Sequence, residues 1–136
     1  MMRLLSGCLL GSLLVVTNVQ ADPARARQNY LLHCMGCHGE TGVGLEGKVP
    51  SMHGTLAMLS RTPQGRYYVL RVPGVTQSTL SNDDLAEVLN WSLREFNDST
   101  SHDEVPAFTA AEIATARRQP LLDVAASRAA ALGDGS

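Results

Sequence analysis

YLLHCMGCHGE, residues 30–40, is the stretch on which the interpretation of the whole chain depends. It places Cys34 and Cys37 three positions apart and puts His38 directly after the second cysteine. Pairs of cysteines at this spacing form redox-active thiols, contribute to zinc sites, close into disulfides or attach a cofactor. The rest of the sequence decides among these four uses.

Three of the four uses leave part of the motif unexplained. A thioredoxin-like redox pair belongs to a βαβ unit, but ARARQNYLLH, just before the motif, has helical character and no strand-rich half follows. A closed zinc site needs four ligands, and the histidines besides His38 are His33, His53 and His102. A plain disulfide would leave His38 without a role.

Covalent attachment of haem uses every residue of the motif. Two thiols separated by two residues can reach the two vinyl groups on one edge of a porphyrin, and the adjacent histidine can then bind the iron. We therefore expect one haem c, with thioethers at Cys34 and Cys37 and with His38 as the proximal ligand. Because thioethers cannot cycle as thiols, iron would be the redox centre.

The N-terminal segment, residues 1–21, has the plan of a secretory signal peptide: an early arginine, an apolar run and a small residue before a polar stretch. The apolar run from about Leu4 to Val16 is short for a membrane span, which needs roughly 20 residues. We expect a periplasmic protein with no stable membrane insertion. Removal of residues 1–21 leaves 136 − 21 = 115 residues with a formal charge of 10 − 13 = −3, which gives no sign of nucleic-acid binding.

The remaining pattern predicts an all-α domain. A first helix is expected from Pro23 or Ala24 to His33, followed by a loop with five glycines between residues 39 and 54. Ser81 with Asp84 three residues later predicts the start of a strong helix that continues to Phe96. Further helices are expected over 55–60, 64–71, from about 109 and, after Pro120, in LLDVAASRAAAL.

Over about residues 24–96 the chain resembles the class I monohaem c-type cytochromes. The resemblance lies in the helix carrying Tyr30, in CMGCHG, in the glycine-rich loop and in LSNDDLAEVLNW with its aromatic Trp91. It implies an orthogonal bundle around one covalent haem, formed by residues 22–96, with residues 97–136 as a helical extension packed on this domain or trailing from it. In the family the first and last core helices cross near the haem, so Ala26 and Tyr30 are expected to meet Leu85, Val88 and Trp91, with Tyr30 and Trp91 packing at the haem.

The same resemblance assigns roles to two residues after the glycine loop. Pro50 lies 50 − 38 = 12 residues after the histidine, where the family has a proline whose carbonyl accepts a hydrogen bond from the imidazole Nδ1. Such a bond orients the ring and makes it a better donor to iron. Met52 lies where the family has an apolar residue against the haem edge.

The opposite side of the iron departs from the family pattern. The family's sixth ligand is a methionine shortly before the closing helix, and the matching stretch RVPGVTQSTLS contains none. Three alternatives stay open: Met58 or Met52, His102 from the tail, or a weak or open position with Gln77 or water nearby.

These expectations lead to two functions. The first is a periplasmic one-electron carrier, not itself an enzyme, that passes electrons between a dehydrogenase or membrane donor and an acceptor protein. The second is a haem-based sensor or small-ligand-binding protein with an open sixth position. For a carrier, Lys48, Arg61, Arg66 and Arg71 are candidates for a basic collar that steers the partner, and ordinary solvated surface charges explain them equally well. The sequence does not decide the oligomeric state.

Overall fold

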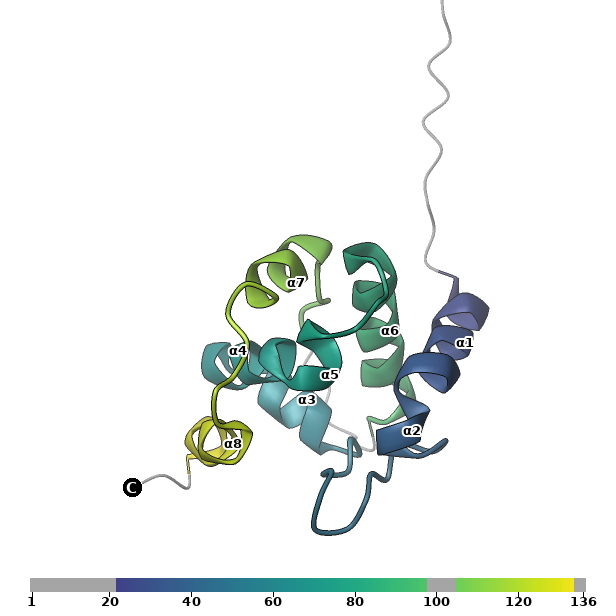
Figure 1. The fold of residues 1–136 in the computed structure, drawn as a ribbon. Coiled ribbons are helices and arrows are strands. Elements are labelled where there is room, and N and C mark those ends of the chain that lie inside the picture. Colours follow the sequence, from purple (N-terminus) through teal and green to yellow (C-terminus); the bar gives the residue numbers. More distant parts are fainter. Residues whose placement is uncertain (1–21, 98–104, 134–136) are drawn as a thin grey trace, which may run out of the picture.

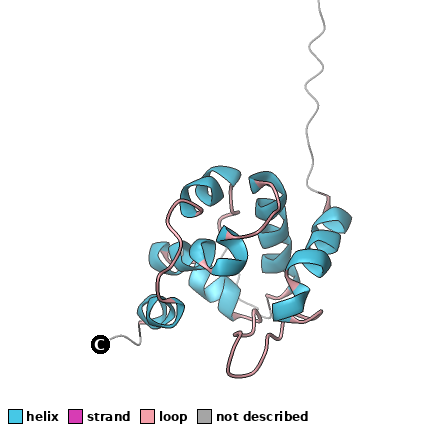
Figure 2. Cartoon of the chain, viewed as in Figure 1, coloured by secondary structure: helices cyan, strands magenta, loops and turns pink. Residues whose placement is uncertain are grey.

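A computed structural model describes residues 22–97 and 105–133, and these residues form an all-α fold with one isolated β-bridge between Leu45 and Val49 (Figures 1 and 2). The predicted signal peptide and His102 lie outside the described residues. The helices of the described part are α1 (Pro23–His33), α2 (Met35–His38), α3 (Thr55–Ser60), α4 (Pro63–Arg71), α5 (Pro73–Thr76), α6 (Asn82–Glu95), α7 (Ala110–Ala116) and α8 (Val124–Leu132).

Capping residues set where the two long helices of the bundle begin. Asp22 precedes α1, and its carboxylate accepts hydrogen bonds from the backbone N–H groups of Ala24 and Arg25 at 3.0 and 3.4 Å. Ser81 precedes α6, and its hydroxyl accepts from the N–H of Asp84 at 3.1 Å, as expected from the sequence. These caps satisfy N–H groups that have no partner within the helix.

Helix α1 crosses α6 through a small aromatic cluster. Ala26 and Tyr30 of α1, both without exposed surface, pack with Val88 and Trp91 of α6 and with Phe96 just after it. The Tyr30 ring lies 5.2 Å from the ring centroids of both Trp91 and Phe96. The predicted crossing is present, except that Leu85 belongs to the neighbouring core cluster.

A larger cluster joins α3, α4, α5 and α6 to the tail. Phe108 is 3% exposed and Ile113 of α7 is 0% exposed, and both pack in the same cluster as Leu59, Leu70 and Leu89. In Figure 1, α7 lies beside α6, and α8 lies below α4 at the other end of the tail. The tail from residue 105 to residue 132 therefore contributes to the main core.

Arg66 fastens the tail to α4. Its guanidinium donates to both carboxylate oxygens of Glu112 at 2.7 and 3.0 Å, and to the carbonyl oxygens of Pro106 and Ala107. It also lies 4.2 Å from the centroid of the Phe108 ring, a cation–π distance. A planar, five-donor guanidinium suits such a multiple contact.

Arg71 makes a second attachment of the same kind, to the carbonyl oxygens of Gln119 and Pro120. Two of the four residues expected to form a basic collar, Arg66 and Arg71, are thus engaged with the tail. None of the four lines the pocket that contains the cysteine motif. The carboxylate of Glu112 pairs with the charge of Arg66, whereas the acceptors of Arg71 are neutral carbonyl oxygens, so the basic collar stays a prediction.

The Arg66–Glu112 pair makes stability depend on pH. Hydrogen bonds from Arg66, and secondarily those from Thr109, lower the pKa of Glu112 from 4.5 to about 2. A carboxylate with a depressed folded-state pKa stabilises the fold above its unfolded pKa and loses that contribution as the pH falls from about 4.5 towards 2. We expect Glu112→Gln to lower the unfolding free energy at neutral pH by about 1 kcal/mol, after allowance for solvent screening of this partly exposed pair.

Urea denaturation of both proteins at a series of pH values measures this effect. The difference between wild type and Glu112→Gln should shrink as the pH falls through this range. Glu46→Gln, which removes an exposed carboxylate from the glycine loop, is the control and should show no such convergence. A constant difference at every pH would contradict the role of the Glu112 charge.

Candidate functional site

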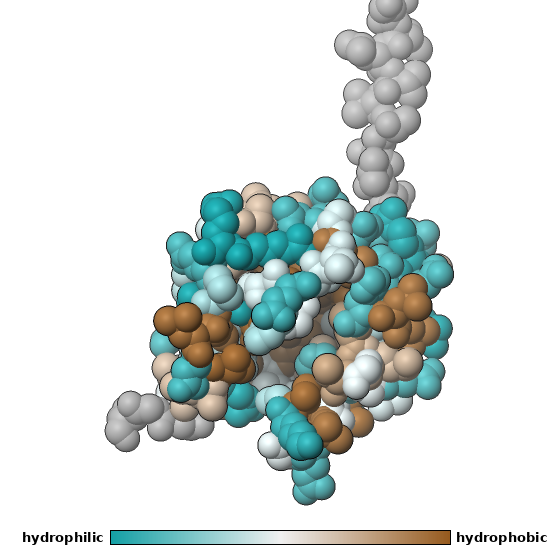
Figure 3. Space-filling view, viewed as in Figure 1, coloured by the Kyte–Doolittle hydropathy of each residue, from teal (hydrophilic) through white to brown (hydrophobic). Residues whose placement is uncertain are grey.

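The cysteine motif lies at the wall of a pocket between α2, the end of the glycine loop, the helices α3 to α6, and α8. The pocket has about 890 Å³ of empty space, part of it open to solvent. A hollow is visible on the face turned to the viewer in Figure 3, with hydrophobic residues on either side of it. The lining residues are mostly apolar on the side away from the motif: Leu56, Leu59, Val69, Val72, Val75, Leu85 and Leu89.

One helical turn brings the motif together. The N–H groups of Cys37 and His38 both donate to the carbonyl oxygen of Cys34, at 3.2 and 3.0 Å, and α2 closes at Gly39. All three side chains line the pocket, and the two cysteines are not joined in a disulfide. The spacing of Cys34, Cys37 and His38 in the sequence therefore places all three side chains at the wall of one pocket.

The partly buried Cys34 thiol is not activated as a nucleophile. Burial, and secondarily the neighbouring Cys37, raises the pKa of the Cys34 thiol to about 11. Reactive cysteines of the thioredoxin type have a lowered pKa, because the thiolate is the nucleophile. A thiol that stays protonated at neutral pH favours a structural or covalent role.

His38 has a buried ring nitrogen that the protein does not satisfy. Its Nδ1 has no hydrogen-bond partner among the described residues. The predicted hydrogen bond from Nδ1 to the carbonyl of Pro50 is therefore not formed, although Pro50 lines the same pocket. Burial lowers the pKa of His38, which favours the neutral imidazole, the form that binds metals.

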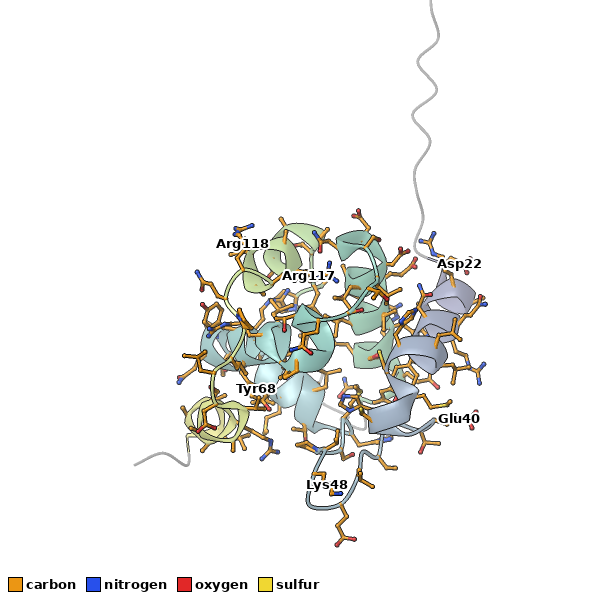
Figure 4. All side chains as sticks on the ribbon, viewed as in Figure 1. Asp22, Glu40, Lys48, Tyr68, Arg117 and Arg118 are labelled. Atoms are coloured by element: carbon orange, nitrogen blue, oxygen red, sulfur yellow. The ribbon has the colours of Figure 1, made fainter. Side chains whose placement is uncertain are left out.

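The glycine loop over residues 39–54 folds back on itself below the helices (Figure 1). The N–H of Gly44 donates to the carbonyl of His38 at 2.8 Å, and the N–H of Met52 donates to the carbonyl of Gly42 at 2.8 Å. Lys48 lies at the outer part of this loop, away from the helices (Figure 4). The inner part of the loop presents Pro50, Ser51 and Met52 to the pocket.

Tyr30 and Trp91 do not line the pocket. Both belong to the crossing of α1 and α6, and the Tyr30 hydroxyl donates to the carbonyl of Gly39 at 2.7 Å. Both rings take part in the packing of α1 against α6, and their contact with a haem stays a prediction. Met52 does line the pocket, as predicted.

Of the candidates for a sixth iron ligand that lie within the described residues, Met52 alone lines the pocket, and His102 is outside those residues. Met58 is 47% exposed on α3 and does not line the pocket. Gln77 is exposed just after α5 and is likewise absent from the wall. The stretch before α6, where the c-type cytochromes have their methionine, does reach the wall of the pocket. There it presents Val72, Gly74 and Val75.

Sequence reasoning gave no role at the haem site to five polar residues of the pocket: His33, Ser51, Thr55, Tyr68 and Arg128. Arg128 comes from α8, VAASRAAAL, in which it is the one charged residue. That isolated charge was the available signal for a special role. Nothing in the sequence indicated that Arg128 of α8 would line the same pocket as the motif, since some ninety residues separate them.

The donor groups fit a haem better than a bare metal ion. In the part of the chain that the structure describes, no three His, Cys, Asp or Glu side chains converge to hold a metal. The porphyrin supplies four nitrogen ligands to the iron, so the protein needs to supply only one or two axial ligands. His38 can supply one such ligand, and Cys34 and Cys37 can bond to the porphyrin edge, since all three line the same largely apolar pocket.

No protein-family model, curated protein or solved structure matches the chain. None of the described helices has the length and apolar character that crossing a membrane requires.

The loop that completes the pocket wall provides a test by a matched pair of substitutions. Gly44 and Gly47 both have positive φ, 78° and 69°, so alanine at either position is strained by about 1 kcal/mol. At Gly44 an added Cβ would also meet the Val49 carbonyl oxygen at 2.2 Å, whereas at Gly47 it would meet nothing within 4 Å. We expect Gly44→Ala to lower the unfolding free energy by about 2 kcal/mol more than Gly47→Ala does.

Urea or thermal denaturation compares the two variants with the wild type. Equal losses in the two variants would mean that the close contact between Gly44 and the strand-like turn at Val49 does not constrain the loop.

Proposed function

We propose that this chain is a haem c protein of the class I cytochrome type and that it acts as a periplasmic one-electron carrier. The observation that supports the proposal most strongly is the placement of Cys34, Cys37 and His38 on a single turn at the wall of one apolar pocket. The all-α fold, with its crossing of α1 and α6, is compatible with it. The activity proposed is electron transfer, with no catalytic residues of its own.

The chain's residues would divide the work of holding the group. Cys34 and Cys37 would form thioethers, His38 would bind the iron, and the carbonyl oxygen of Pro50 would accept a hydrogen bond from the His38 Nδ1–H. The group, when bound, supplies a one-electron iron couple. The apolar walls contributed by α3 to α6 exclude water from it, and exclusion of water and the axial ligand are two of the protein's means of setting a haem potential.

The partner would be a periplasmic redox protein, such as a dehydrogenase that donates electrons. Because Arg66 and Arg71 are engaged with the tail, we propose an apolar docking face beside the motif as the alternative to a basic collar. Met35 is 38% exposed between the two cysteines, and Val43 and Leu45 of the adjoining loop are 59% and 52% exposed. Exposed apolar residues of this kind are typical of transient docking surfaces.

A second candidate function is the binding of a small ligand at an open sixth position. One observation favours it: the segment before α6 presents Val72, Gly74 and Val75 to the pocket, and none of these side chains can bind iron. Haems with a vacant position bind small molecules such as carbon monoxide, whereas methionine-ligated haems resist them. Both functions would use the same haem. They differ only in whether a protein group binds the sixth position of the iron, on the side opposite His38.

Single substitutions in the motif test attachment. Wild-type protein, produced with a periplasmic haem-attachment system, should give a pyridine haemochrome spectrum typical of two thioether bonds. Cys34→Ala and Cys37→Ala should each give the spectrum of one remaining thioether or no stable haem, because each removes one covalent bond. Met35→Ala, inside the motif but without a donor role, is the control and should retain full attachment; colourless wild-type protein would overturn the proposal.

Carbon monoxide separates the two functions. If no protein group binds the sixth position strongly, the reduced protein should bind carbon monoxide at once, with a shift of its Soret band. Met52→Ala and Met58→Ala test the methionines: the carrier with methionine ligation predicts resistance in the wild type and binding in one variant. Immediate binding in the wild type, unchanged in both variants, would favour the ligand-binding function.

A further inference from the structure

Arg128 is a pocket residue whose charge nothing in the described part of the chain neutralises. It is half-buried on α8 and lines the pocket together with the cysteine motif. Its guanidinium forms no ion pair or hydrogen bond within the described residues. Three arginines at contacts between the tail and the rest of the chain differ from it. Arg66, Arg71 and Arg117 each donate hydrogen bonds to several acceptors.

Tyr68 stands beside Arg128 at the same wall. The tyrosine is 9% exposed on α4, and Figure 4 places it between α4 and α8. Its hydroxyl has no hydrogen-bond partner among the described residues. Burial raises the pKa of Tyr68 and the nearby charge of Arg128 lowers it, so the two polar groups are close enough to act on one ligand.

Arg128 and Tyr68 together favour the binding of an anion. A guanidinium presents several N–H donors in a plane, matched to the two oxygens of a carboxylate, and a phenol adds one more donor. A half-buried cation without a counter-ion is unfavourable unless a ligand supplies the negative charge. Within residues 22–97 and 105–133, no carboxylate lines this pocket.

We infer that Arg128 and Tyr68 form a carboxylate-binding site at the wall of the pocket, with the arginine carried there by α8. Two sources could supply the carboxylate: a porphyrin bound at the cysteine motif, or a free small carboxylate in solution. The first source rests on the proposed function, and the second does not. In both cases the tail helix has a direct part in ligand recognition.

The experiment uses the full chain and four variants. Arg128→Gln removes the charge, Arg128→Lys keeps the charge without the planar donor set, and Tyr68→Phe removes one donor. Arg118→Gln is the matched control: it removes one positive charge from the tail at a residue that hydrogen-bonds locally to Ala114 and Thr115 and lies beside α7 (Figure 4). Far-ultraviolet circular dichroism verifies that all variants are folded.

The first measurement is the midpoint potential of the haem-loaded proteins. A positive charge near the iron disfavours the oxidised state, so Arg128→Gln should lower the potential relative to both wild type and Arg118→Gln. Arg128→Lys should lower it less, and Tyr68→Phe should shift it in the same direction. This pattern, with no effect of added acetate, identifies a porphyrin carboxylate as the occupant.

The second measurement is a titration with sodium acetate against sodium chloride at equal ionic strength, followed by the thermal midpoint. A ligand that binds only the folded state raises the midpoint as its concentration exceeds its dissociation constant. A saturable rise in wild type and Arg118→Gln that is lost in Arg128→Gln identifies a free carboxylate as the occupant. This titration needs no haem, so it also decides the inference if the wild type proves to carry none and the proposed function fails.

Two results would overturn the inference. In haem-loaded protein, Arg128→Gln could behave as Arg118→Gln does in both measurements, which would leave the proposed function intact. In protein without haem, acetate could give no stabilisation that depends on Arg128.

Discussion

Tyr30 connects the helix crossing to the cysteine motif, and the arrangement of the pocket depends on it. Its ring has no exposed surface and packs between α1 and α6, while its hydroxyl donates to the carbonyl of Gly39 at 2.7 Å. Tyr30 precedes the motif and Gly39 follows it, so one side chain holds both ends of the turn that carries Cys34 and His38. Both ends of the turn are held in a packed interior, where displacements are costly. The side chains of the motif therefore stay directed towards the pocket.

The tail contributes in two distinct ways. Its first part, from residue 105 to Gln119, is fastened by Arg66 and Arg71 and buries Phe108 and Ile113 in the main core. Its last part, α8, buries none of its own residues fully and packs through the partly buried Ala131 and Leu132. The same extension thus stabilises the fold at one end and completes the wall of the pocket at the other.

Local signals accounted for much of the fold and for the centre of the site. Ser81 with Asp84, Pro23 and the glycines after the motif placed α1, α6 and the loop close to where they are found, because caps and positive φ are set by neighbouring residues. Contacts between segments far apart in the sequence could not be predicted from such local patterns. Arg66 was expected to be a surface charge, and no role was expected for Arg128, because residues some forty to ninety positions away decide what these two side chains contact.

The two faces of the pocket also differ in how they follow from the sequence. The face with the motif is built from consecutive residues, so its chemistry can be inferred from spacing alone. The opposite face is assembled from α3, α4, α5 and α8, and its side chains are apolar except for Thr55, Tyr68 and Arg128. Elements with few buried residues open at the lowest free-energy cost, and among the helices at this face α8 is the one with none. Access to the pocket from this side therefore depends on how firmly α8 is held, and a carboxylate bound by Arg128 would hold it in place.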